Sequence, residues 1–498
     1  MLGLNNSTNQ HYRNLETHLR RENPLLVEAV KEFRKLDSIA RKMGLLQVDQ
    51  SYTRKISWWP LISVLGTFSA GKSSFINYYL EQPLKETGNQ AVDDKFSAIC
   101  YSSDGESRVL PGISLEADPR FPFYGIADEI EKVASGEGGQ VNSYIQMLTC
   151  ASENLKGQIF IDSPGFDADD QRSATLEITD YIIELSDLCL IFFDARHPEP
   201  GAMKDTLKHL VTDRAFGRNT DKFVYILNQI DTTAEEDNLE DVVAAWQRAM
   251  AREGMTAGKF FTLYNPNQAI EIQDTTRRER YERKRDADMQ DIKERIDNVR
   301  TERLYKITGS LEKRCREIEH HQLPALKQYL DRWLRSVLLT DLVVILLVVL
   351  GAGGAMFYQP AMQSWVNGLL AQVSSNRTAQ FLLTAAILVA LYCLHMLSRH
   401  WHKKRLLADI PASGMDAGYN ESVAHAFEKN TVFFRSVFSP SPVGWGYFSR
   451  RKLKRIARRA DEFIQQLNNK FARPSGAIEE ETTNTQPVMN EPEPQTST

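Results

Sequence analysis

A phosphate-binding loop is the feature that most restricts how this chain can fold. The stretch GTFSAGKSS, Gly66–Ser74, fits the pattern G-x-x-x-x-G-K-[ST] and lies between a run typical of a strand and a run typical of a helix. In that setting the glycines let the backbone close around phosphate groups, and the amide groups of the turn face an anion at the helix N-terminus. Lys72 is then expected to reach the β- and γ-phosphates and Ser73 to bind Mg²⁺, and both are assigned a catalytic role. The predicted nucleotide-binding residues of this loop are Gly66, Ser69, Ala70, Gly71, Lys72, Ser73 and Ser74.

Short apolar runs alternate with helical patterns from residue 61 to residue 270. The runs are LISVL at 61–65, IFI at 159–161, CLIFF at 189–193, FVYIL at 223–227 and FFTLY at 260–264. Runs that are apolar at every position are typical of strands buried on both faces of a sheet, and their alternation with helices is typical of parallel pairing. The chain is therefore predicted to contain an α/β domain with a mainly parallel sheet and helices on both faces.

Two further motifs follow strand-like runs. In IFIDSPGF, Asp162 and Gly165 fit D-x-x-G, where the carboxylate lies beside Mg²⁺ and the glycine amide contacts the γ-phosphate. In ILNQID, Asn228 and Asp231 fit N-K-x-D, where the aspartate accepts hydrogen bonds from guanine; the alternative is that both are ordinary loop residues. Gln229 replaces the lysine of that pattern, so guanine is the predicted base and adenine stays open. With the loop, these motifs predict a P-loop GTPase domain in which Ser73 and Asp162 hold Mg²⁺, and Asp162, Gly165, Asn228 and Asp231 bind the nucleotide.

Length and composition limit the remaining possibilities. A chain of 498 residues exceeds what one hydrophobic core usually organises, so several structural units are expected. The formal net charge of -5 gives no electrostatic case for nucleic acid, and no such partner is predicted. The 5 cysteines are scattered without paired spacing, which predicts reduced thiols rather than a disulfide framework or a metal site. The N-terminus lacks the apolar core of a secretory signal, so the first half is expected to fold in a cytoplasm.

Residues 271–337 form a densely charged stretch whose apolar residues recur every three or four positions. This spacing predicts long helices with one narrow apolar seam, which we interpret as a stalk; a helix that is merely solvated is the alternative. The seam slips by one residue between Val299 and Leu304. A capped amphipathic helix is also predicted from Pro24 to Met43, ahead of the nucleotide-binding domain. The seam consists of Met289, Ile292, Ile296, Val299, Leu304, Ile307 and Leu311.

Two apolar segments, residues 338–358 and 381–397, are each close to the roughly 20 residues that a helix needs to cross a bilayer. Basic residues flank the pair on its outer sides, whereas the connection carries only Arg377. This asymmetry predicts a two-helix transmembrane hairpin, 338–398, with both termini cytoplasmic, in the inner membrane if the host is bacterial. The alternatives are buried helices of a helical domain, and a shallow hairpin that enters one leaflet because glycines and Pro360 bend its first segment. The flanking residues are Arg332, Arg335, Arg399, Lys403, Lys404 and Arg405.

Beyond the hairpin the chain is predicted to return to the stalk. Arg450–Phe471 has the pattern of a basic amphipathic helix, which either binds anionic lipid or packs its apolar face on the stalk. Packing is favoured because the second half is no longer basic. Residues 472–498 are rich in Glu, Thr, Pro and Asn and are predicted to be disordered. The predicted units are an N-terminal helical segment, 1–60; the nucleotide-binding G domain, 61–270; the stalk, 271–337; the hairpin, 338–398; the returning helical segment, 399–471; and the tail, 472–498.

The motif residues resemble the dynamin superfamily, and within it the EHD-type ATPases and the bacterial dynamin-like proteins. The resemblance covers roughly residues 20 to 320 and rests on GTFSAGKSSFINYYL, ETGNQAVDDKF, IDSPGFDADDQRS, LIFFDARHPEP and LNQID. It implies a membrane-anchored GTPase that binds GTP with Mg²⁺ and forms homo-oligomers through its G domain and stalk. It further implies that hydrolysis serves to tether, fuse or divide a lipid bilayer. Because EHD-type relatives bind ATP, ATP stays open as the nucleotide.

The sequence departs from this superfamily in its switch region. Relatives carry a threonine that holds Mg²⁺ and the catalytic water, whereas NQAVDDKF offers Val92 and Asp93, and Thr87 substitutes only if the loop runs differently. Slow or assembly-dependent hydrolysis is therefore expected, and no residue is assigned to position the water. The alternative function is a GTP- or ATP-dependent switch that recruits a partner to the membrane with little hydrolysis. A transporter or channel is disfavoured, since two helices offer no obvious ion pathway.

Overall fold

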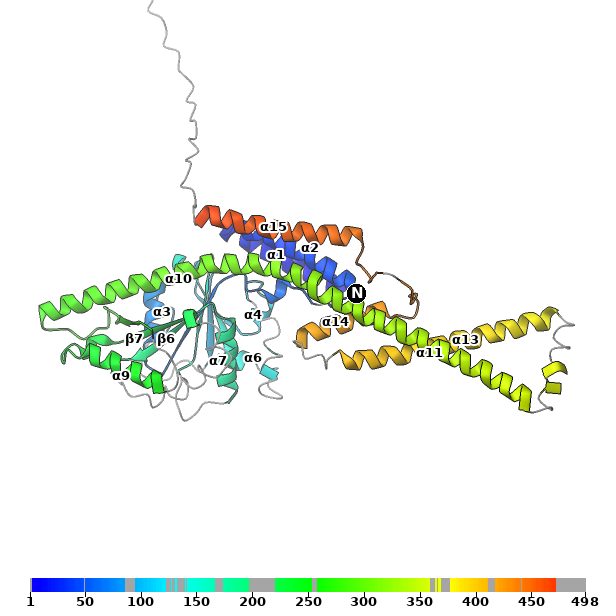
Figure 1. Ribbon diagram of the computed structural model, residues 1–498. Coiled ribbons are helices and arrows are strands. Elements are labelled where there is room, and N and C mark those ends of the chain that lie inside the picture. The colour runs from blue at the N-terminus through cyan, green and yellow to red at the C-terminus, as the bar shows by residue number, and fades with distance from the viewer. Residues whose placement is uncertain are drawn as a thin grey trace, which may run out of the picture.

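The sheet of the α/β domain is the framework on which the other elements are placed (Figure 1). The computed structural model describes residues 2–48, 50–85, 95–121, 127, 130–131, 139, 141–165, 173–196, 220–252, 258–358, 363–364, 366–368, 377–410, 417–439 and 441–471. Within these residues one 8-stranded sheet has the order β3-β4-β2-β5-β1-β6-β7-β8. The strands are β1 Leu61–Gly66, β2 Phe96–Tyr101, β3 Arg108–Pro111, β4 Ile145–Cys150, β5 Ile159–Asp162, β6 Leu188–Asp194, β7 Phe223–Asn228 and β8 Phe260–Leu263.

The strand pairing confirms the expected mainly parallel sheet. The five apolar runs form β1, β5, β6, β7 and β8, which pair in parallel, and every residue of β1, β6 and β7 is buried. Two pairs are antiparallel, β2 with β5 and β3 with β4. β2, β3 and β4 lie in the long interval between Lys72 and Asp162, where no strand was predicted. Ser97 and Gln146 interrupt the apolar character of β2 and β4, and β3 is short and largely exposed, so none of them shows an uninterrupted apolar run.

Helices cover both faces of the sheet. α3 and the first half of α10 pack on one face against Ile62, Val64 and Phe192, while α7 and α9 cover the other face against Leu65 and Ile191. The longer helices of the chain are α1 Leu2–Glu22, α2 Pro24–Met43, α3 Lys72–Leu80, α7 Ser173–Leu185, α9 Leu239–Arg252, α10 Thr275–Glu317, α11 Leu323–Tyr358, α13 Arg377–Asp409, α14 Ala417–Asn430 and α15 Tyr447–Phe471. Two short helices, α4 Ser114–Ala117 and α6 Val141–Tyr144, lie within the β3–β4 region.

The apolar seam of α10 divides between two hydrophobic cores. Its first part, Met289–Val299, packs on the sheet beside Ile62 and Phe192. Its second part, Leu304–Leu311, packs in a helical bundle with α1, α2 and α15, beside residues such as Phe33. The one-residue slip in the seam occurs where the packing partner of α10 changes. One extra residue rotates the apolar face by ~100° about the helix axis, so the second part of the seam faces the bundle instead of the sheet. The sequence assigned the whole stretch to a stalk, whereas the first half of α10 belongs to the core of the G domain.

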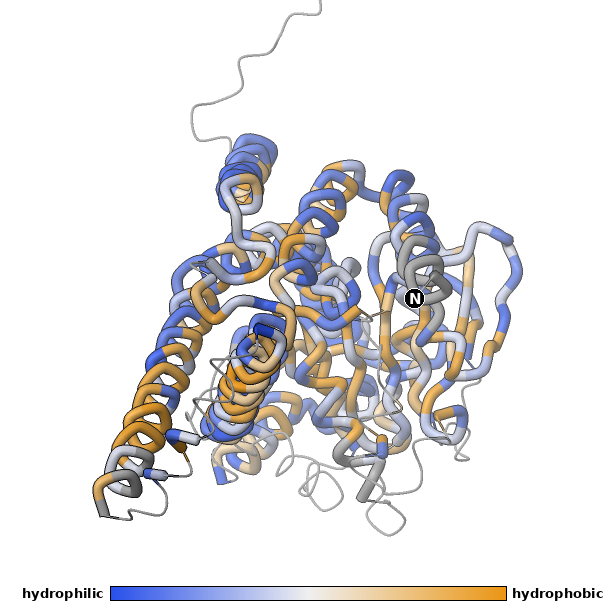
Figure 2. The backbone as a smooth tube through the Cα atoms, turned by 90° about the vertical axis from the view of Figure 1, so that its right-hand side faces the viewer, coloured by the Kyte–Doolittle hydropathy of each residue, from blue (hydrophilic) through white to orange (hydrophobic). Residues whose placement is uncertain are grey.

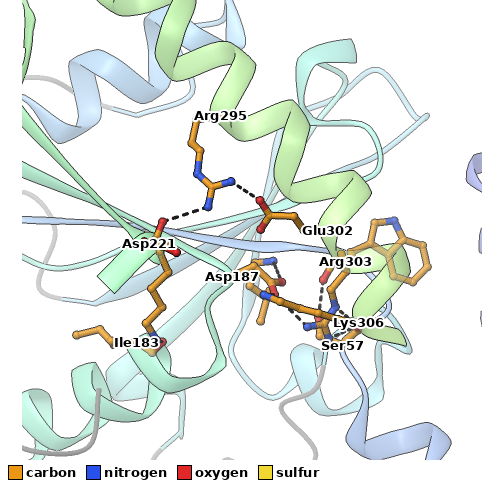
Figure 3. A network of polar contacts seen from close by, with 11 residues as sticks. Ser57, Ile183, Asp187, Asp221, Arg295, Glu302, Arg303 and Lys306 are labelled. Carbon is orange, nitrogen blue, oxygen red and sulfur yellow. Dashed lines mark hydrogen bonds and ion pairs between the residues drawn. The ribbon is translucent and has the colours of Figure 1, made fainter. Parts of the chain in front are cut away.

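A polar contact beside the seam holds α10 to the G domain (Figure 3). Asp187, which follows α7, is 4% exposed and accepts a hydrogen bond from the Leu61 backbone N–H. Its Oδ1 lies 3.2 Å from Arg303 Nη1 and 3.0 Å from Lys306 Nζ, both on α10. Arg303 also donates to the carbonyl of Ser57, in the segment that leads into β1. We call this group of residues the Asp187 clamp.

The helical bundle closes when α15 returns along α2 and α10 (Figure 1). The sequence favoured packing on the stalk over lipid binding for this helix, and the packing is observed. α1 was not predicted as a separate helix; its Tyr12 hydroxyl donates to the buried carboxylate of Asp37 on α2 at 2.6 Å. The buried residues of α15 are Leu453, Ile456, Ala460, Phe463 and Leu467.

One continuous helix joins the G domain to the first apolar segment, because a π-helical turn at Ile318–Gln322 connects α10 to α11. α11 and α13 lie side by side where they leave the bundle and diverge further out (Figure 1). Both are long and apolar enough to cross a membrane, and only 6% of each apolar window is buried, which disagrees with helices buried in a helical domain (Figure 2). At the base of the hairpin, Asp341 Oδ2 lies 2.6 Å from His395 Nδ1.

Replacing Asp187 with Ala is expected to lower the temperature at which the G domain unfolds. The change leaves Arg303, whose side chain is 15% exposed, without its carboxylate, and loss of one partner from a largely buried ion pair costs on the order of 3 kcal/mol. Differential scanning fluorimetry of the full chain in detergent measures the shift. The matched control is Asp221→Ala, because among the described residues the hydrogen bond between Asp221 and α10 uses the main-chain carbonyl of Asp221, which accepts from Arg295 at 3.1 Å and is kept in the variant. Equal unfolding temperatures for the two variants would contradict a stabilising role for the clamp.

Candidate functional site

The predicted phosphate-binding loop leaves the end of β1 and enters α3, near the middle of the sheet. The geometry requires glycine at two positions of this loop. Gly66 has a φ of +154°, and a Cβ there would lie 2.6 Å from the carbonyl oxygen of Phe192. Gly71 has a φ of +86°, and a Cβ there would lie 2.0 Å from Nδ2 of Asn228. A side chain at either position would push the loop away from β6 or β7, so close packing alone requires glycine at both.

Lys72 is enclosed by its own loop. The residue is 7% exposed, and its Nζ donates hydrogen bonds to the carbonyl oxygens of Gly66 at 2.8 Å and Thr67 at 3.0 Å. Because Lys72 begins α3, its ammonium group and the amides at the helix N-terminus belong to one small region. Ser73 and Ser74 follow in the first turn, and Ser74 Oγ donates to Gln268 Oε1 at 2.9 Å. This region offers a cation and a helix N-terminus to an anion.

Asp162 ends β5, which pairs with β1 at the same edge of the sheet. Its Oδ2 is paired with Lys85, whose backbone is fixed by two hydrogen bonds to the Asn77 side chain at 2.7 Å and 2.9 Å. Its Oδ1 is buried and has no hydrogen-bond partner among the described residues. A buried carboxylate oxygen without a partner suits a Mg²⁺ ion or one of its water ligands, so the residues fit the predicted ion. Gly165 lies against the loop, since a Cβ there would lie 2.9 Å from Phe68 Cα.

The turn after β7 ties the predicted base-binding residues to the phosphate-binding loop. Asn228 Nδ2 donates to the Ala70 carbonyl at 2.9 Å, and Gln229 Nε2 donates to the Ser69 carbonyl at 2.6 Å. Gln229 has a left-handed φ of +64°, a conformation that non-glycine residues seldom adopt. The side chain that departs from the lysine pattern therefore anchors the loop in this structure.

Asp231 lies in the same turn and is 7% exposed. Its Oδ2 accepts a hydrogen bond at 2.9 Å from the backbone N–H of Ile270, which follows β8. Burial raises the pKa of this carboxyl group above its ordinary value, while the Ile270 amide and the charge of Arg196 act in the opposite direction. The charged form that guanine recognition needs is thus less favoured than in an exposed aspartate.

Sequence reasoning missed several residues of this site, among them Lys85, Arg196 and Gln268. Arg196 follows β6 and donates to both carboxylate oxygens of Asp194, and also to the Ser69 carbonyl at 3.3 Å. Because it follows a buried strand at the carboxyl edge of a parallel sheet, attention to strand ends would have identified it. Lys85 and Gln268 lie outside any motif and carry no such signal. The predicted switch residues Thr87, Val92 and Asp93 lie outside the described residues.

Comparisons with known proteins match the part of the chain that contains this site. Residues 62–230 match the dynamin family. The chain is 26% identical over 182 residues to EH domain-containing protein 3 of Homo sapiens, covering 34% of this chain and 31% of that protein. It is 27% identical over 204 residues to EH domain-containing protein 2 of Mus musculus, covering 39% and 34%. The chain thus spans about a third of the length of these relatives.

A solved structure described as "An oligomerised bacterial dynamin pair provides a mechanism for the long range sensing and tethering of membranes" is similar over a longer stretch. The similarity covers 95% of this chain and 77% of that chain, at 13% sequence identity and a TM-score of 0.31. A score this low says nothing about how the units of the two chains are arranged.

The ratio of GTP affinity to ATP affinity is expected to fall as the pH is lowered. Protonation of Asp231 would remove the acceptor predicted for guanine, and because burial raises the pKa of Asp231, the loss would begin at a higher pH than for an ordinary aspartate. Taking the ratio cancels the titration of the nucleotide phosphates. Fluorescence titration between neutral and mildly acidic pH measures it, and Asp231→Asn should give a low ratio that does not change with pH. A pH-dependent ratio in that variant would assign the effect to another group.

Proposed function

We propose that this chain, whose residues 62–230 match the dynamin family, is a membrane-anchored GTPase of that superfamily that self-assembles to remodel a lipid bilayer. One observation supports the proposal most. The nucleotide motifs gather at one edge of the sheet, and the helix packed on that sheet continues without a break into an exposed apolar hairpin. Movement in the G domain would therefore reach the membrane through a rigid helix rather than through a flexible linker.

The nucleotide would bind across the loop, Asp162 and the turn after β7. Ser73 and Asp162 would hold Mg²⁺, which when bound neutralises charge on the β- and γ-phosphates. Lys72 would exchange the carbonyls of Gly66 and Thr67 for phosphate oxygens. Asp231 would accept hydrogen bonds from guanine, with ATP as the alternative ligand because Gln229 replaces the usual lysine.

The hairpin would fix the orientation of the chain in the membrane. Crossing by α11 and α13 would place both termini on the cytoplasmic side, next to the basic residues that flank the apolar segments, and in the inner membrane of a bacterial host. The division into N-terminal segment, G domain, stalk, hairpin, returning segment and tail belongs to the same proposal. Self-association through the G domain and the stalk is also part of this proposal, and the family resemblance supports it.

A second candidate function is a nucleotide-dependent switch that recruits a partner to the membrane with little hydrolysis. The observation that favours it is the switch sequence NQAVDDKF, which lacks the threonine that relatives use to hold Mg²⁺ and water. Clustering or tubulation of vesicles discriminates between the two functions. A remodelling protein reconstituted in vesicles clusters or deforms them when GTP is added, whereas a recruitment switch leaves bare vesicles unchanged.

Lys72→Ala is expected to weaken GTP binding at least 100-fold, which corresponds to about 2.7 kcal/mol, because it removes the cation that faces the phosphates. Fluorescent GTP and ATP analogues with Mg²⁺ are titrated into detergent-solubilised protein. The matched control is Lys31→Ala on α2, since Lys31 is exposed and pairs with the exposed Glu28. Both variants should enter vesicles as the native chain does. Unchanged affinity in Lys72→Ala would refute the loop assignment, and tighter binding of ATP than of GTP would refute guanine recognition by Asp231.

A further inference from the structure

The connection between α14 and α15 exposes large apolar side chains outside the hairpin. Phe434 is 95% exposed and Phe438 is 70% exposed, and Val432 and Phe433 are also exposed. These four residues lie within 431–439, which we call the aromatic loop. Only Val437 of its large apolar residues is buried in the structure as described. Exposed aromatic residues grouped in this way mark a surface that meets another apolar phase.

The aromatic loop is held against α13 at the level where that helix becomes apolar. The Phe433 ring lies 6.2 Å from the ring of Tyr392, a residue of the second apolar segment. Arg399 Nη2 donates to the carbonyls of Val432 at 3.1 Å and Arg435 at 2.7 Å. In Figure 1 this connection lies beside α11 and α13 where they leave the bundle. The loop is therefore positioned at the boundary between the hairpin's polar flank and its apolar stretch.

Cations follow the aromatic loop along the chain. α15 begins with the exposed rings of Tyr447 and Phe448, and its first turns carry a basic outer face opposite the buried Leu453. In Figure 1 this end of α15 points towards the hairpin. Among the described residues of this face, Arg459 forms an ion pair with the carboxylate of Glu462. The exposed basic residues are Arg450, Arg451, Lys454, Arg455, Arg458 and Arg459.

We propose that the aromatic loop and the first turn of α15 bind the anionic headgroup layer of the same bilayer that holds the hairpin. The inference rests on the proposed crossing of that bilayer by α11 and α13. Aromatic rings favour the interface between headgroups and acyl chains, and arginines favour anionic lipid. The contacts with Tyr392 and Arg399 make the loop continuous with the lipid-facing surface of the hairpin. The chain would thus touch the membrane at a third place and fix its tilt as well as its depth.

The test uses a fluorophore whose emission is quenched by spin-labelled lipid. Phe434→Cys is introduced in a Cys393→Ser background, and the full chain is labelled and reconstituted in phosphatidylcholine vesicles with or without phosphatidylglycerol. Cys100, Cys150, Cys189 and Cys315 are buried, and burial raises the pKa of Cys189 to about 11, so they should not compete for the label. Ile270→Cys in the same background is the control, because Ile270 is exposed and lies in the connection between β8 and α10. In Figure 1 the start of α10 lies at the opposite end of the molecule from the hairpin.

The label at position 434 is expected to be quenched several-fold more strongly than the label at 270, and more strongly with phosphatidylglycerol than without it. Arg450→Gln with Arg451→Gln should remove the effect of phosphatidylglycerol. The matched pair Arg278→Gln with Arg283→Gln on α10 should leave it unchanged. Equal effects of the two pairs would overturn the assignment of the anionic contact to α15.

A label on native Cys393, inside the second apolar segment, separates this inference from the proposed function. Quenching at 393 without quenching at 434 would overturn the inference and leave the hairpin in the bilayer. Absence of quenching at both positions would overturn the crossing and the inference together. The label at 434 could instead be shielded only at a high protein-to-lipid ratio and show no quenching by spin-labelled lipid. That result would assign the aromatic loop to a contact between two copies of the chain and would also overturn the inference.

Discussion

The shared burial of α10 is the constraint on which the arrangement of the chain depends. One face of this helix completes the core under the sheet, and the next stretch completes the core of the helical bundle. Burial of one large aliphatic side chain is worth about 1.5–3 kcal/mol, so the seven seam residues tie the two units strongly to a single helix. Neither core is complete without α10. The Asp187 clamp lies where α10 passes from the sheet to the helical bundle. Its charged hydrogen bonds are directional, so they fix the orientation of α10 on the G domain more closely than apolar packing does.

The charged groups of the candidate site are already paired inside the protein. Asp162 pairs with Lys85, Asp231 accepts from the Ile270 amide, and Lys72 donates to two carbonyls of its own loop. A nucleotide would therefore replace existing interactions rather than satisfy groups that have none, and its net gain in free energy would be small. The buried Oδ1 of Asp162, which lacks a protein partner among the described residues, is the point at which Mg²⁺ would add an interaction. This balance predicts weak nucleotide binding.

Much of the fold could be predicted from the sequence because several elements have one-sided or uniform burial. The runs that became β1, β6 and β7 are buried on both faces and hence apolar throughout, and the seam of α10 has a helical period. β2 and β4 were missed because Ser97 and Gln146 interrupt them, and α1 because its buried Tyr12 is recognisable only beside Asp37. The motif residues of the site could be placed on strand ends, but Lys85 and Gln268 reach it by tertiary folding alone. The slip between Val299 and Leu304 was visible in the sequence, yet its meaning required the two cores.

The unbroken helix from α10 into α11 fixes the distance between the Asp187 clamp and the apolar segment of α11. From Lys306 in the clamp to Asp341 at the edge of the apolar segment it advances ~1.5 Å per residue, roughly 50 Å in all. In a bilayer crossed by the hairpin, this length holds the G domain many times farther from the headgroups than the screening length of about 8 Å at physiological ionic strength. The surface charge of the membrane would then leave the electrostatics of the nucleotide site unchanged. Lipid composition would affect that site only through forces transmitted along the helix. Two chains that met through their G domains from facing bilayers would keep a gap set by helix length rather than by the chemistry of either surface.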